Sequence, residues 1–564
     1  MKEVLENKTC KLCAQNFPIY QEDQDFYDKI SPSFAGKKFQ IPRPTLCPEC
    51  RQQRRLAINN ERNLYKRVCD ATGREIISIY SPDKDYIVYD QDFWWSENWE
   101  LEMNREDFNF WESFFSQFYT LSKKVPKRAL VKWTGSENCA YTNCIGASKN
   151  CYLTFNGMKN EDCLYVDSLS DAQDCVDCSE IRHSSQCYEC SEVIECHSCT
   201  YVSQSKSCTD SSYLLNCENC DACFACVNLR NKKYHIFNVE YSKEEYLEKK
   251  EALINNRYSS QEFYEFSLEY PRQWLRISWS EKVSGNMIYN SKNIFQGFEI
   301  YNAEDIRYSS NIYNGAHDCM DAFVCLNNSN KLYEMSLANK NCSNLLFCHD
   351  CWNNCNNLLY CSECKLTSDC FGCTGLVKRQ YCILNKQYTK DEYEMLVPKI
   401  ITYMQQTWEW GEFFPINISP FGYNETLAHE HYPLSKKEII EISGKWSDYI
   451  PTQSKADKII QAQKLPHDIA DIPDDILTWA IECELTKKPF RIIASELLFY
   501  RKHHLPIPRK HPNSRYVERK SLRNMRKIFA RNCDSCEAEM ETTYSPERLE
   551  KVFCIDCYNK EIYG

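Results

Sequence analysis

A row of evenly spaced cysteines in the middle of this sequence limits the folds that the chain can adopt. The stretch from Cys139 to Cys226 holds 15 cysteines, and its longest row repeats every 12 residues: Cys139, Cys151, Cys163, Cys175, Cys187 and Cys199. A short fixed period indicates one structural unit stacked on copies of itself. Tyr, Leu, Val and Ile inside the units, with Asn, Asp and Ser between them, are typical of short strands joined by turns. We therefore predict a mainly β fold with a β-solenoid whose coil takes 12 residues, or one layer of a coil twice that length.

A second, looser array follows the first. It contains 11 cysteines from Cys319 to Cys382, and its rungs are marked by Asn293, Asp305, Asp318 and Asn341. Both arrays end in the pattern that begins a capped helix, which is Ser242 with Glu245 in the first and Thr389 with Glu392 in the second. Because a stack of strands would otherwise expose its last edge, we predict two related solenoids that are each closed by a helix.

The cysteine ladder itself allows three interpretations. A thiol is a small apolar group, so a close-packed core of free cysteines is the simplest of them. The same grid also creates Cys-x-x-Cys pairs that could bind a metal or a cluster, and the possible ligands are Cys175, Cys178, Cys187, Cys190, Cys196 and Cys199. Disulfides between rungs are the third interpretation.

Each end of the chain carries two complete Cys-x-x-Cys pairs, which supply the four thiolates of a tetrahedral structural Zn²⁺ site. Four thiolates leave no open position for a substrate, so we expect structural zinc and no catalytic zinc. The predicted cofactor is Zn²⁺, about two ions per chain. The predicted ligands are Cys10, Cys13, Cys47 and Cys50 at one end, and Cys533, Cys536, Cys554 and Cys557 at the other.

The two end blocks look like copies of each other. Phe17 and Tyr27 are ten residues apart, and so are Phe490 and Tyr500. Each block has positions for two metal sites, but only one site is complete in each copy. The reduced sites are Cys69, Thr72, Asp90 and Phe93 in the first block, and Cys483, Thr486, His511 and Ser514 in the last. We expect these positions to pack as ordinary core without tightly bound zinc.

Positive charge is concentrated beside the cysteine pairs, although the whole chain has a net charge of −11. Residues 51–67 carry +5 and residues 501–531 carry +10, whereas residues 139–226 carry −9. Basic residues spaced three and four apart share one helix face and can contact phosphates. The candidate nucleic-acid contacts are Arg51, Arg54, Arg55, Arg515, Arg519, Lys520, Arg523 and Arg526. The alternative is that these helices pack on the acidic solenoid of the same chain or of a second copy.

These patterns divide the chain into segments. We predict an N-terminal module at 1–99, an aromatic linker helix at 100–130, the first solenoid and its cap at 131–256, the second and its cap at 257–404, a linker region at 405–475 and a C-terminal module at 476–564. The polar start MKEVLENKTC does not look like a signal peptide, and no apolar run is long enough to span a membrane. We therefore expect a cytoplasmic protein.

The end modules resemble the treble-clef and zinc-ribbon groups, in which a helix begins at a cysteine pair as CPECRQQRR does here. The stretches CPECRQQRR, LYKRVCDATG, SIYSPDK, YDQDFWW and SCTDSSYLLNCENC together resemble a set of uncharacterised Cys-rich zinc-ribbon proteins of uncultured bacteria with reduced genomes. This resemblance covers most of the chain. It implies the same architecture and a cytoplasmic setting, and it adds no catalytic residue.

The leading functional hypothesis is a non-enzymatic zinc-binding scaffold whose basic ends bind RNA, DNA or a ribonucleoprotein. The alternative is a Cys-rich solenoid that binds metal or other proteins, with self-assembly into a homo-oligomer as one form. The chain has no glycine-rich phosphate loop, nucleophile elbow or HExxH motif. A remote alternative is an HNH-like nuclease, which would use His503, His504, His511 and Asn513. We predict no enzymatic activity and no membrane partner.

Overall fold

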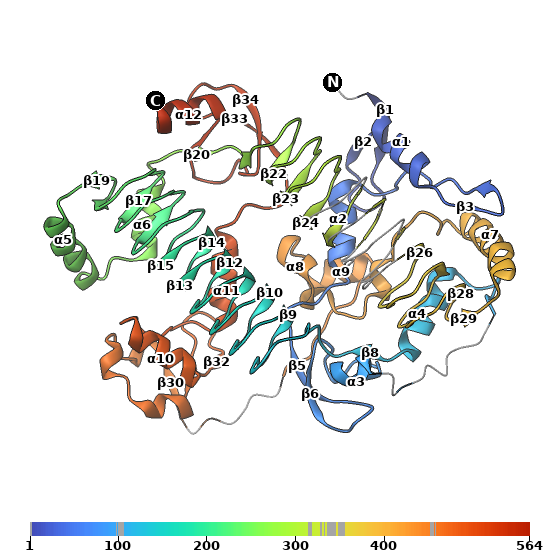
Figure 1. Ribbon diagram of the computed structural model, residues 1–564, viewed down its shortest axis with the longest axis horizontal. Coiled ribbons are helices and arrows are strands. Elements are labelled where there is room, and N and C mark those ends of the chain that lie inside the picture. The colour runs from blue at the N-terminus through green and yellow to red at the C-terminus, as the bar shows by residue number, and fades with distance from the viewer. Residues whose placement is uncertain are drawn as a thin grey trace.

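The computed structural model of the protein describes residues 3–96, 99, 107–313, 319–326, 330, 331, 333–335, 346, 347, 356–451, 456 and 458–564. Two β-solenoids lie beside one another, and the two ends of the chain pack against them (Figure 1). We call residues 131–241 the first solenoid and residues 272–388 the second solenoid. Residues 3–95 are the N-terminal module, and residues 459–564 are the C-terminal module.

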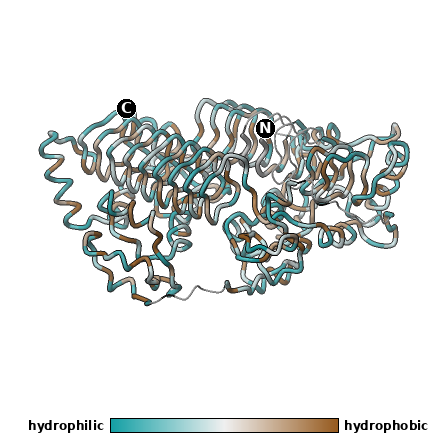
Figure 2. Tube along the Cα trace, turned by 60° about the horizontal axis from the view of Figure 1, so that its bottom comes forward, coloured by the Kyte–Doolittle hydropathy of each residue, from teal (hydrophilic) through white to brown (hydrophobic). Residues whose placement is uncertain are grey.

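The first solenoid is built from short parallel strands. One sheet holds β9 (Asn143–Gly146), β10 (Phe155–Met158), β11 (Asp167–Ser170), β12 (Ser179–Arg182) and β14 (Ser191–Ile194). The other holds β13 (Ser185–Tyr188), β15 (His197–Thr200), β16 (Ser212–Leu215), β17 (Phe224–Val227), β18 (His235–Ile236) and β19 (Val239–Glu240). Phe155 pairs with Asp167, and Asp167 pairs with Ser179, so each residue lies beside the one 12 positions later. The predicted mainly β fold is confirmed, and its coil has 12 residues; Figure 2 shows the coils as parallel turns of the trace.

A left-handed backbone conformation at every third residue closes each coil. From Asn138 to Phe237, every third residue has a φ between 46° and 62°. Each of these residues turns the chain, so the coil is four-cornered and closes after 12 residues. The left-handed conformation costs a non-glycine residue roughly 1–2 kcal/mol and is easiest for Asn and Asp. The corners accordingly include many Asn and Asp residues.

The residue after each corner points into the coil and explains the cysteine ladder. Cys175 and Cys178 each follow a corner residue and are 0% exposed. Val166 and Ile181 occupy equivalent inward positions and are also buried. Because the coil is narrow, its core accepts only small and medium apolar side chains, and a thiol is one of the smallest.

Replacing a corner asparagine by valine should destabilise the first solenoid more than replacing it by glycine. Asn219 is an exposed corner with a φ of 53°, and its side chain donates to Asn231 Oδ1 at 3.1 Å. Both substitutions remove that hydrogen bond, but only the β-branched valine is strained in the left-handed region. We expect Asn219→Val to be less stable than Asn219→Gly by about 1–2 kcal/mol, measured by urea denaturation. Equal stability of the two variants would contradict the role of the corners.

The second solenoid repeats this design with insertions. Its strands are β21 (Ile277–Ser278), β22 (Gly285–Tyr289), β23 (Gly297–Tyr301), β24 (Ser310–Tyr313), β25 (Phe323–Leu326), β26 (Leu358–Leu359), β27 (Cys370–Phe371), β28 (Cys382–Ile383) and β29 (Lys386–Gln387). Gly285 pairs with Gly297 at the regular 12-residue register, whereas Ser310 pairs with Phe323, 13 residues later. This insertion accounts for looser spacing in the sequence. The rungs that we predicted at Asp318 and Asn341 lie outside the described residues.

Side chains join the two solenoids along their flanks. The guanidinium of Arg182 in β12 lies 4.2 Å from the ring centroid of Tyr301 in β23. Arg276 Nη2 lies 2.8 Å from Glu192 Oε1. The solenoids are therefore arranged side by side and not end to end.

Both solenoids are closed by antiparallel strands and helices. In the first, β18 pairs with β19 and is followed by α5 (Lys243–Asn255) and α6 (Ser260–Ser267). In the second, β28 pairs with β29 and is followed by α7 (Lys390–Gln406). The predicted helix starts are confirmed, because Ser242 caps α5 and Thr389 caps α7.

The end modules alternate short strands and helices. The N-terminal module contains β1 (Val4–Thr9), β2 (Asn16–Tyr20), α1 (Gln21–Ile30), β3 (Ser33–Phe34), β4 (Lys37–Lys38), α2 (Pro48–Leu56), β5 (Tyr65–Val68), β6 (Glu75–Ser78), β7 (Val88–Tyr89) and α3 (Gln91–Trp95). The C-terminal module contains β30 (Ile459–Gln461), η3 (Ala462–Lys464), η4 (Ile469–Asp471), η5 (Asp474–Thr478), β31 (Ala480–Glu482), β32 (Pro489–Phe490), α10 (Ala494–Lys502), α11 (Pro512–Ser521), β33 (Phe529–Asn532), β34 (Glu539–Thr542), β35 (Val552–Phe553) and α12 (Ile555–Tyr563).

The remaining helices and strands lie outside the regular coils and the two end modules. They are α4 (Phe114–Lys124), β8 (Lys127–Arg128), β20 (Arg272–Gln273), η1 (Ile416–Ile418), η2 (Tyr423–Glu425), α8 (Leu427–His431) and α9 (Lys436–Glu441). The aromatic helix α4 packs on the second solenoid, where the Phe114 and Phe371 ring centroids are 5.4 Å apart.

Within the part of the chain that the structure describes, no helix combines the length and the hydrophobicity needed to cross a membrane.

Each end module bridges both solenoids. In the N-terminal module, β7 pairs with β8 just before the first solenoid and Glu61 O accepts from Asn143 Nδ2 of that solenoid at 3.1 Å, but α2 packs beside β25 of the second. In the C-terminal module, β35 pairs with β20 at the start of the second solenoid, but α11 packs on the first. The N-terminal module thus leads into the first solenoid but docks its helix α2 on the second, and the C-terminal module pairs with the start of the second but docks its helix α11 on the first. We call this arrangement the crossing of the end modules.

Candidate metal centres

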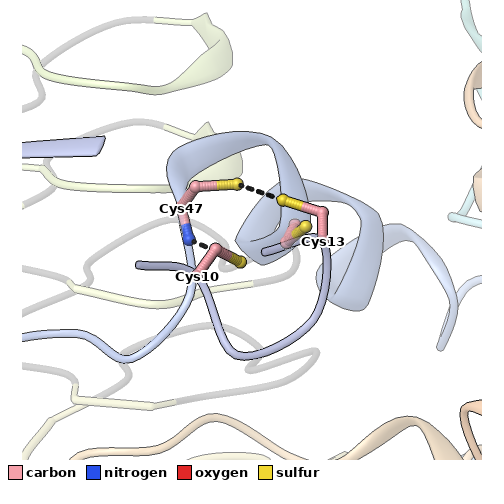
Figure 3. A group of neighbouring side chains, drawn as sticks. Cys10, Cys13 and Cys47 are labelled. Atoms are coloured by element: carbon pink, nitrogen blue, oxygen red, sulfur yellow. Dashed lines mark hydrogen bonds between the residues drawn. The ribbon is translucent and has the colours of Figure 1, made fainter. Parts of the chain in front are cut away.

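The N-terminal four-cysteine group joins a turn to the start of α2. Cys10 and Cys13 flank the turn after β1, Cys47 is the residue that precedes α2, and Cys50 lies in its first turn. The four sulfur atoms all lie within 4.8 Å of one another. Figure 3 shows the Sγ atoms of Cys13 and Cys47, 3.7 Å apart, and the backbone N–H of Cys47 donating to Cys10 Sγ at 3.3 Å. All of these residues except Cys13 are buried.

The C-terminal group has the same construction and greater exposure. Its four sulfur atoms, of Cys533, Cys536, Cys554 and Cys557, also lie within 4.8 Å of one another. The Sγ atoms of Cys536 and Cys554 are 3.8 Å apart, and the backbone N–H of Cys554 donates to Cys533 Sγ at 3.2 Å. Only Cys533 is buried.

Both groups could hold a metal ion, as their spacing in the sequence predicted. Four soft sulfur ligands at these separations match the donor set of closed tetrahedral sites. In each group, one backbone N–H already donates to a sulfur atom, which helps to hold that sulfur in place. Such a site stabilises a fold and offers no coordination position to a substrate.

The reduced sites are held by hydrogen bonds. Cys483 Sγ lies 3.8 Å from Ser514 Oγ and accepts from the backbone N–H of Thr486 at 3.5 Å. His511 precedes α11, and its Nδ1 accepts from the backbone N–H of Asn513 at 3.1 Å. Burial, with Lys488 and Arg515 nearby, lowers the pKa of His511 to about 4, so the ring is neutral and able to accept at pH 7. In the other copy, Cys69 Sγ accepts from the backbone N–H of Asp90 at 3.1 Å.

The six possible ladder ligands belong to the core of the first solenoid. Cys175, Cys178, Cys187, Cys190, Cys196 and Cys199 are all buried free thiols. Their S–H groups donate to backbone carbonyls, as Cys190 does to Cys199 O at 3.3 Å. Apart from the two end groups, no three potential ligand atoms of the described residues lie within 4.8 Å of one another. The ladder is therefore packed as a core of thiols.

The basic residues of α2 are buried against the second solenoid. Arg51 Nε lies 2.7 Å from Asp321 Oδ2, and Arg55 also reaches Asp321, at 3.6 Å. Arg54 contacts Glu334 at 2.8 Å and Glu412 at 2.7 Å. The exposed fraction of the Arg51 side chain is only 2%. None of these three arginines is available to a phosphate in this structure.

The basic residues of α11 are engaged in the same way on the first solenoid. Arg515 pairs with Asp177, and Arg519 Nη1 lies 3.0 Å from Asp177 Oδ1 and 3.2 Å from Glu189 Oε2. Lys520 lies 3.6 Å from Asp167. These carboxylates occupy neighbouring coils, and Asp177 and Glu189 are 12 residues apart on the same corner. That period in the acidic residues is the sequence signal for this interface, and we missed it.

The segment after α11 runs between the two solenoids. Arg523 contacts Glu180 and, at 3.5 Å, Glu192 of the first solenoid, and it contacts Glu299 of the second at 3.1 Å. Arg526 lies 2.7 Å from the same Glu299. The eight residues that we predicted as nucleic-acid contacts are thus all paired with carboxylates of the same chain, and the prediction that they form an exposed basic surface is wrong. They form the interface with the acidic solenoids of the same chain, which was the alternative interpretation.

Glu61, which joins the N-terminal module to Asn156 of the first solenoid, should make the stability of the protein depend on pH. Glu61 Oε2 accepts from Asn156 Nδ2 at 2.5 Å, and burial, followed by the charge of Asp167, raises the pKa of Glu61 from 4.5 to about 7. The folded state therefore binds this proton more tightly than the unfolded state. The resulting stabilisation is complete below pH 4.5 and is lost as the pH rises through about 7.

We expect Glu61→Gln, which keeps an acceptor for Asn156, to be more stable than the natural protein at pH 8 by about 1–2 kcal/mol. The advantage should shrink as the pH falls through 7 and disappear below pH 4.5, where Glu61 becomes neutral in both the folded and unfolded states. Urea denaturation of both proteins across this range measures the difference. An advantage of constant size would contradict titration of Glu61 as its cause.

Protein-family models include none that matches this chain, and no curated protein matches it.

Proposed function

We propose that this protein is a non-enzymatic zinc-binding scaffold. One observation carries the proposal: each module that holds a complete four-cysteine group also bridges both solenoids. Four thiolates per site favour zinc over harder metals and suit a structural ion. In this proposal the modules are of the treble-clef and zinc-ribbon kinds. The free thiols of the described ladder fit a reducing compartment, and we propose the cytoplasm.

The metal content of the full-length protein tests the proposal. Protein purified without added metal or chelator should contain about two zinc ions per chain. Cys47→Ser and Cys554→Ser should each lose one ion. Cys199→Ser is a matched control, because it changes a ladder thiol whose inward position is occupied by Ser211 in the next coil. Protein without zinc would overturn the proposal, and a large excess of metal that falls in Cys199→Ser would transfer the function to the ladder.

Binding of RNA, DNA or a ribonucleoprotein remains a separate prediction. A nucleic acid that used the eight basic residues would have to displace their carboxylate partners, which argues against these residues as its contacts. Titration of labelled single-stranded RNA and duplex DNA from about 50 to about 200 mM salt tests binding by any surface. An affinity that falls steeply with salt would support the prediction, and no binding at the lowest salt would end it.

A further inference from the structure

We propose that the metal of the N-terminal four-cysteine group controls the docking of α2 on the second solenoid, whereas α11 docks on the first solenoid without a metal. This inference rests on the proposed function, because it takes the N-terminal group to hold zinc. It adds a regulatory role to that site. Three observations carry it: the two docked surfaces match, the starts of the two helices differ, and the arginines of α2 follow the metal ligands directly.

The two helices dock on equivalent surfaces. The Arg51 guanidinium lies 5.4 Å from the ring centroid of Tyr308, and that of Arg515 lies 4.6 Å from that of Tyr165. In each interface, a tyrosine of the end module also packs on a tyrosine of the solenoid. The ring centroids of Tyr27 and Tyr333 are 5.3 Å apart in one interface, and those of Tyr500 and Tyr188 are 5.9 Å apart in the other. A difference in behaviour between the two interfaces must therefore come from the way each helix is held.

The start of α2 is held by cysteine sulfur. No side chain caps the helix, and the backbone N–H of Cys47, which precedes it, donates to Cys10 Sγ at 3.3 Å. The buried apolar cluster around this start is small, and three of its five members are thiols: Cys10, Phe17, Ile19, Cys47 and Cys50. Without a metal to join the sulfurs, three small thiols, Phe17, Ile19 and the partly buried Leu46 are what this cluster offers to fix the start of the helix.

The start of α11 is held by ordinary hydrogen bonds and packing. His511 caps the helix through the backbone N–H of Asn513 at 3.1 Å. The ring centroids of His511 and Phe490 are 6.1 Å apart, with the rings edge to face. Ser514, at the position matching Cys50, lies with its Oγ 3.8 Å from Cys483 Sγ. The copy that lacks a full ligand set thus has a cap that the metal-binding copy lacks.

Arg51 couples the metal group of α2 to its docking surface. It directly follows Cys50, pairs with Asp321 and donates from Nη1 to Leu46 O at 2.8 Å, in the loop before Cys47. A movement of the cysteine turn therefore displaces a guanidinium that must keep its geometry in a buried ion pair. Such pairs are held by geometry, because the desolvation of both charges offsets much of their attraction. Once α2 moves, the released charges regain water, which makes undocking feasible.

Trypsin digestion of the full-length protein tests the inference, because trypsin cleaves after arginine. The variant Cys10→Ser/Cys13→Ser removes half of the N-terminal ligand set and leaves the C-terminal group intact. We expect it to lose one zinc ion and to be cleaved at Arg51, Arg54 and Arg55 about tenfold faster or more, since cleavage follows the population of the open form. Cleavage at Arg515 and Arg519 in the same digest should not change.

A second variant tests the opposite interface. His511→Ala should keep both zinc ions while cleavage at Arg515 and Arg519 accelerates. Loss of one ion in the cysteine variant with no faster cleavage at Arg51 would overturn the inference and leave the proposed function standing. Faster cleavage at both helices would also overturn it, because the metal would then support the whole fold. A natural protein that contains no zinc would instead overturn the proposed function.

Discussion

Replacement of Asp177 by alanine should lower the free energy of unfolding by about 3 kcal/mol or more. The Asp177 side chain is 0% exposed and accepts from two arginines, Arg515 and Arg519, whose side chains are only 4% and 5% exposed. Alanine would leave both cations buried with weaker partners, Glu496 at 3.4 Å and Glu189 at 3.2 Å. An uncompensated buried charge is far more costly than the loss of an exposed ion pair.

Asp174 provides the control for this substitution. It is the preceding corner of the same coil, with a φ of 50° against 54° at Asp177, so alanine meets the same backbone conformation at both positions. Its partner Lys502 is 3.1 Å away and has a 55% exposed side chain, so we expect Asp174→Ala to cost less than about 1 kcal/mol. Urea denaturation of both variants, together with hydrogen exchange in α11, measures the contrast. Equal losses of stability would contradict the role of Asp177 as the anchor of α11.

Replacement of Cys554 by serine should unfold the last part of the C-terminal module, from β33 to α12. Structural zinc supplies about 10–16 kcal/mol to small zinc domains, so the loss of one ligand removes most of what holds this part together. The effect should extend to the start of the second solenoid, because β35 pairs with β20 and Thr542 Oγ1 donates to Trp274 O at 2.6 Å. Hydrogen exchange should show loss of protection in all of these strands, and the metal content should fall by one ion.

Cys69→Ser is the control in the duplicated module, where Cys69 occupies the position of Cys533 in the complete group and Asp90 that of Cys554. Cys69 is buried and accepts from Asp90, but the group around it lacks the other cysteines. Serine can accept the same hydrogen bond, so we expect the zinc content to stay constant and the stability to change by about 1 kcal/mol. A loss of zinc in Cys69→Ser would show that the reduced site binds metal after all.

The coil length could be predicted from the sequence because identical inward positions recur in every coil. Cys163, Cys175 and Cys187 fill one such position in three successive coils, and their period is the period of the coil. The corner at every third residue could not be predicted in this way. Corners hold residues as different as Tyr165, Asp177 and Glu189, because the backbone conformation and not the side chain defines them.

The two four-cysteine groups could also be predicted from the sequence, because their possible metal ligands come in pairs close in sequence. The destination of the basic helices was not. An arginine-rich helix face has the same pattern whether it meets phosphate or carboxylate, and the carboxylates here come from a different part of the chain. Arg51 and Asp321 are separated by 270 residues, so only the folded chain shows that they meet.

The crossing of the end modules has a consequence for the order in which a ribosome produces the protein. At about 5–20 residues per second, roughly 15–50 s pass between the synthesis of Arg51 and that of Asp321. During this interval α2 has no surface on which to dock, although all four N-terminal cysteines have already been made. Asp177, in contrast, precedes Arg515 by 338 residues, so the surface for α11 is complete long before that helix emerges. The N-terminal module must therefore wait for its docking site, and the C-terminal module can dock as soon as it leaves the ribosome.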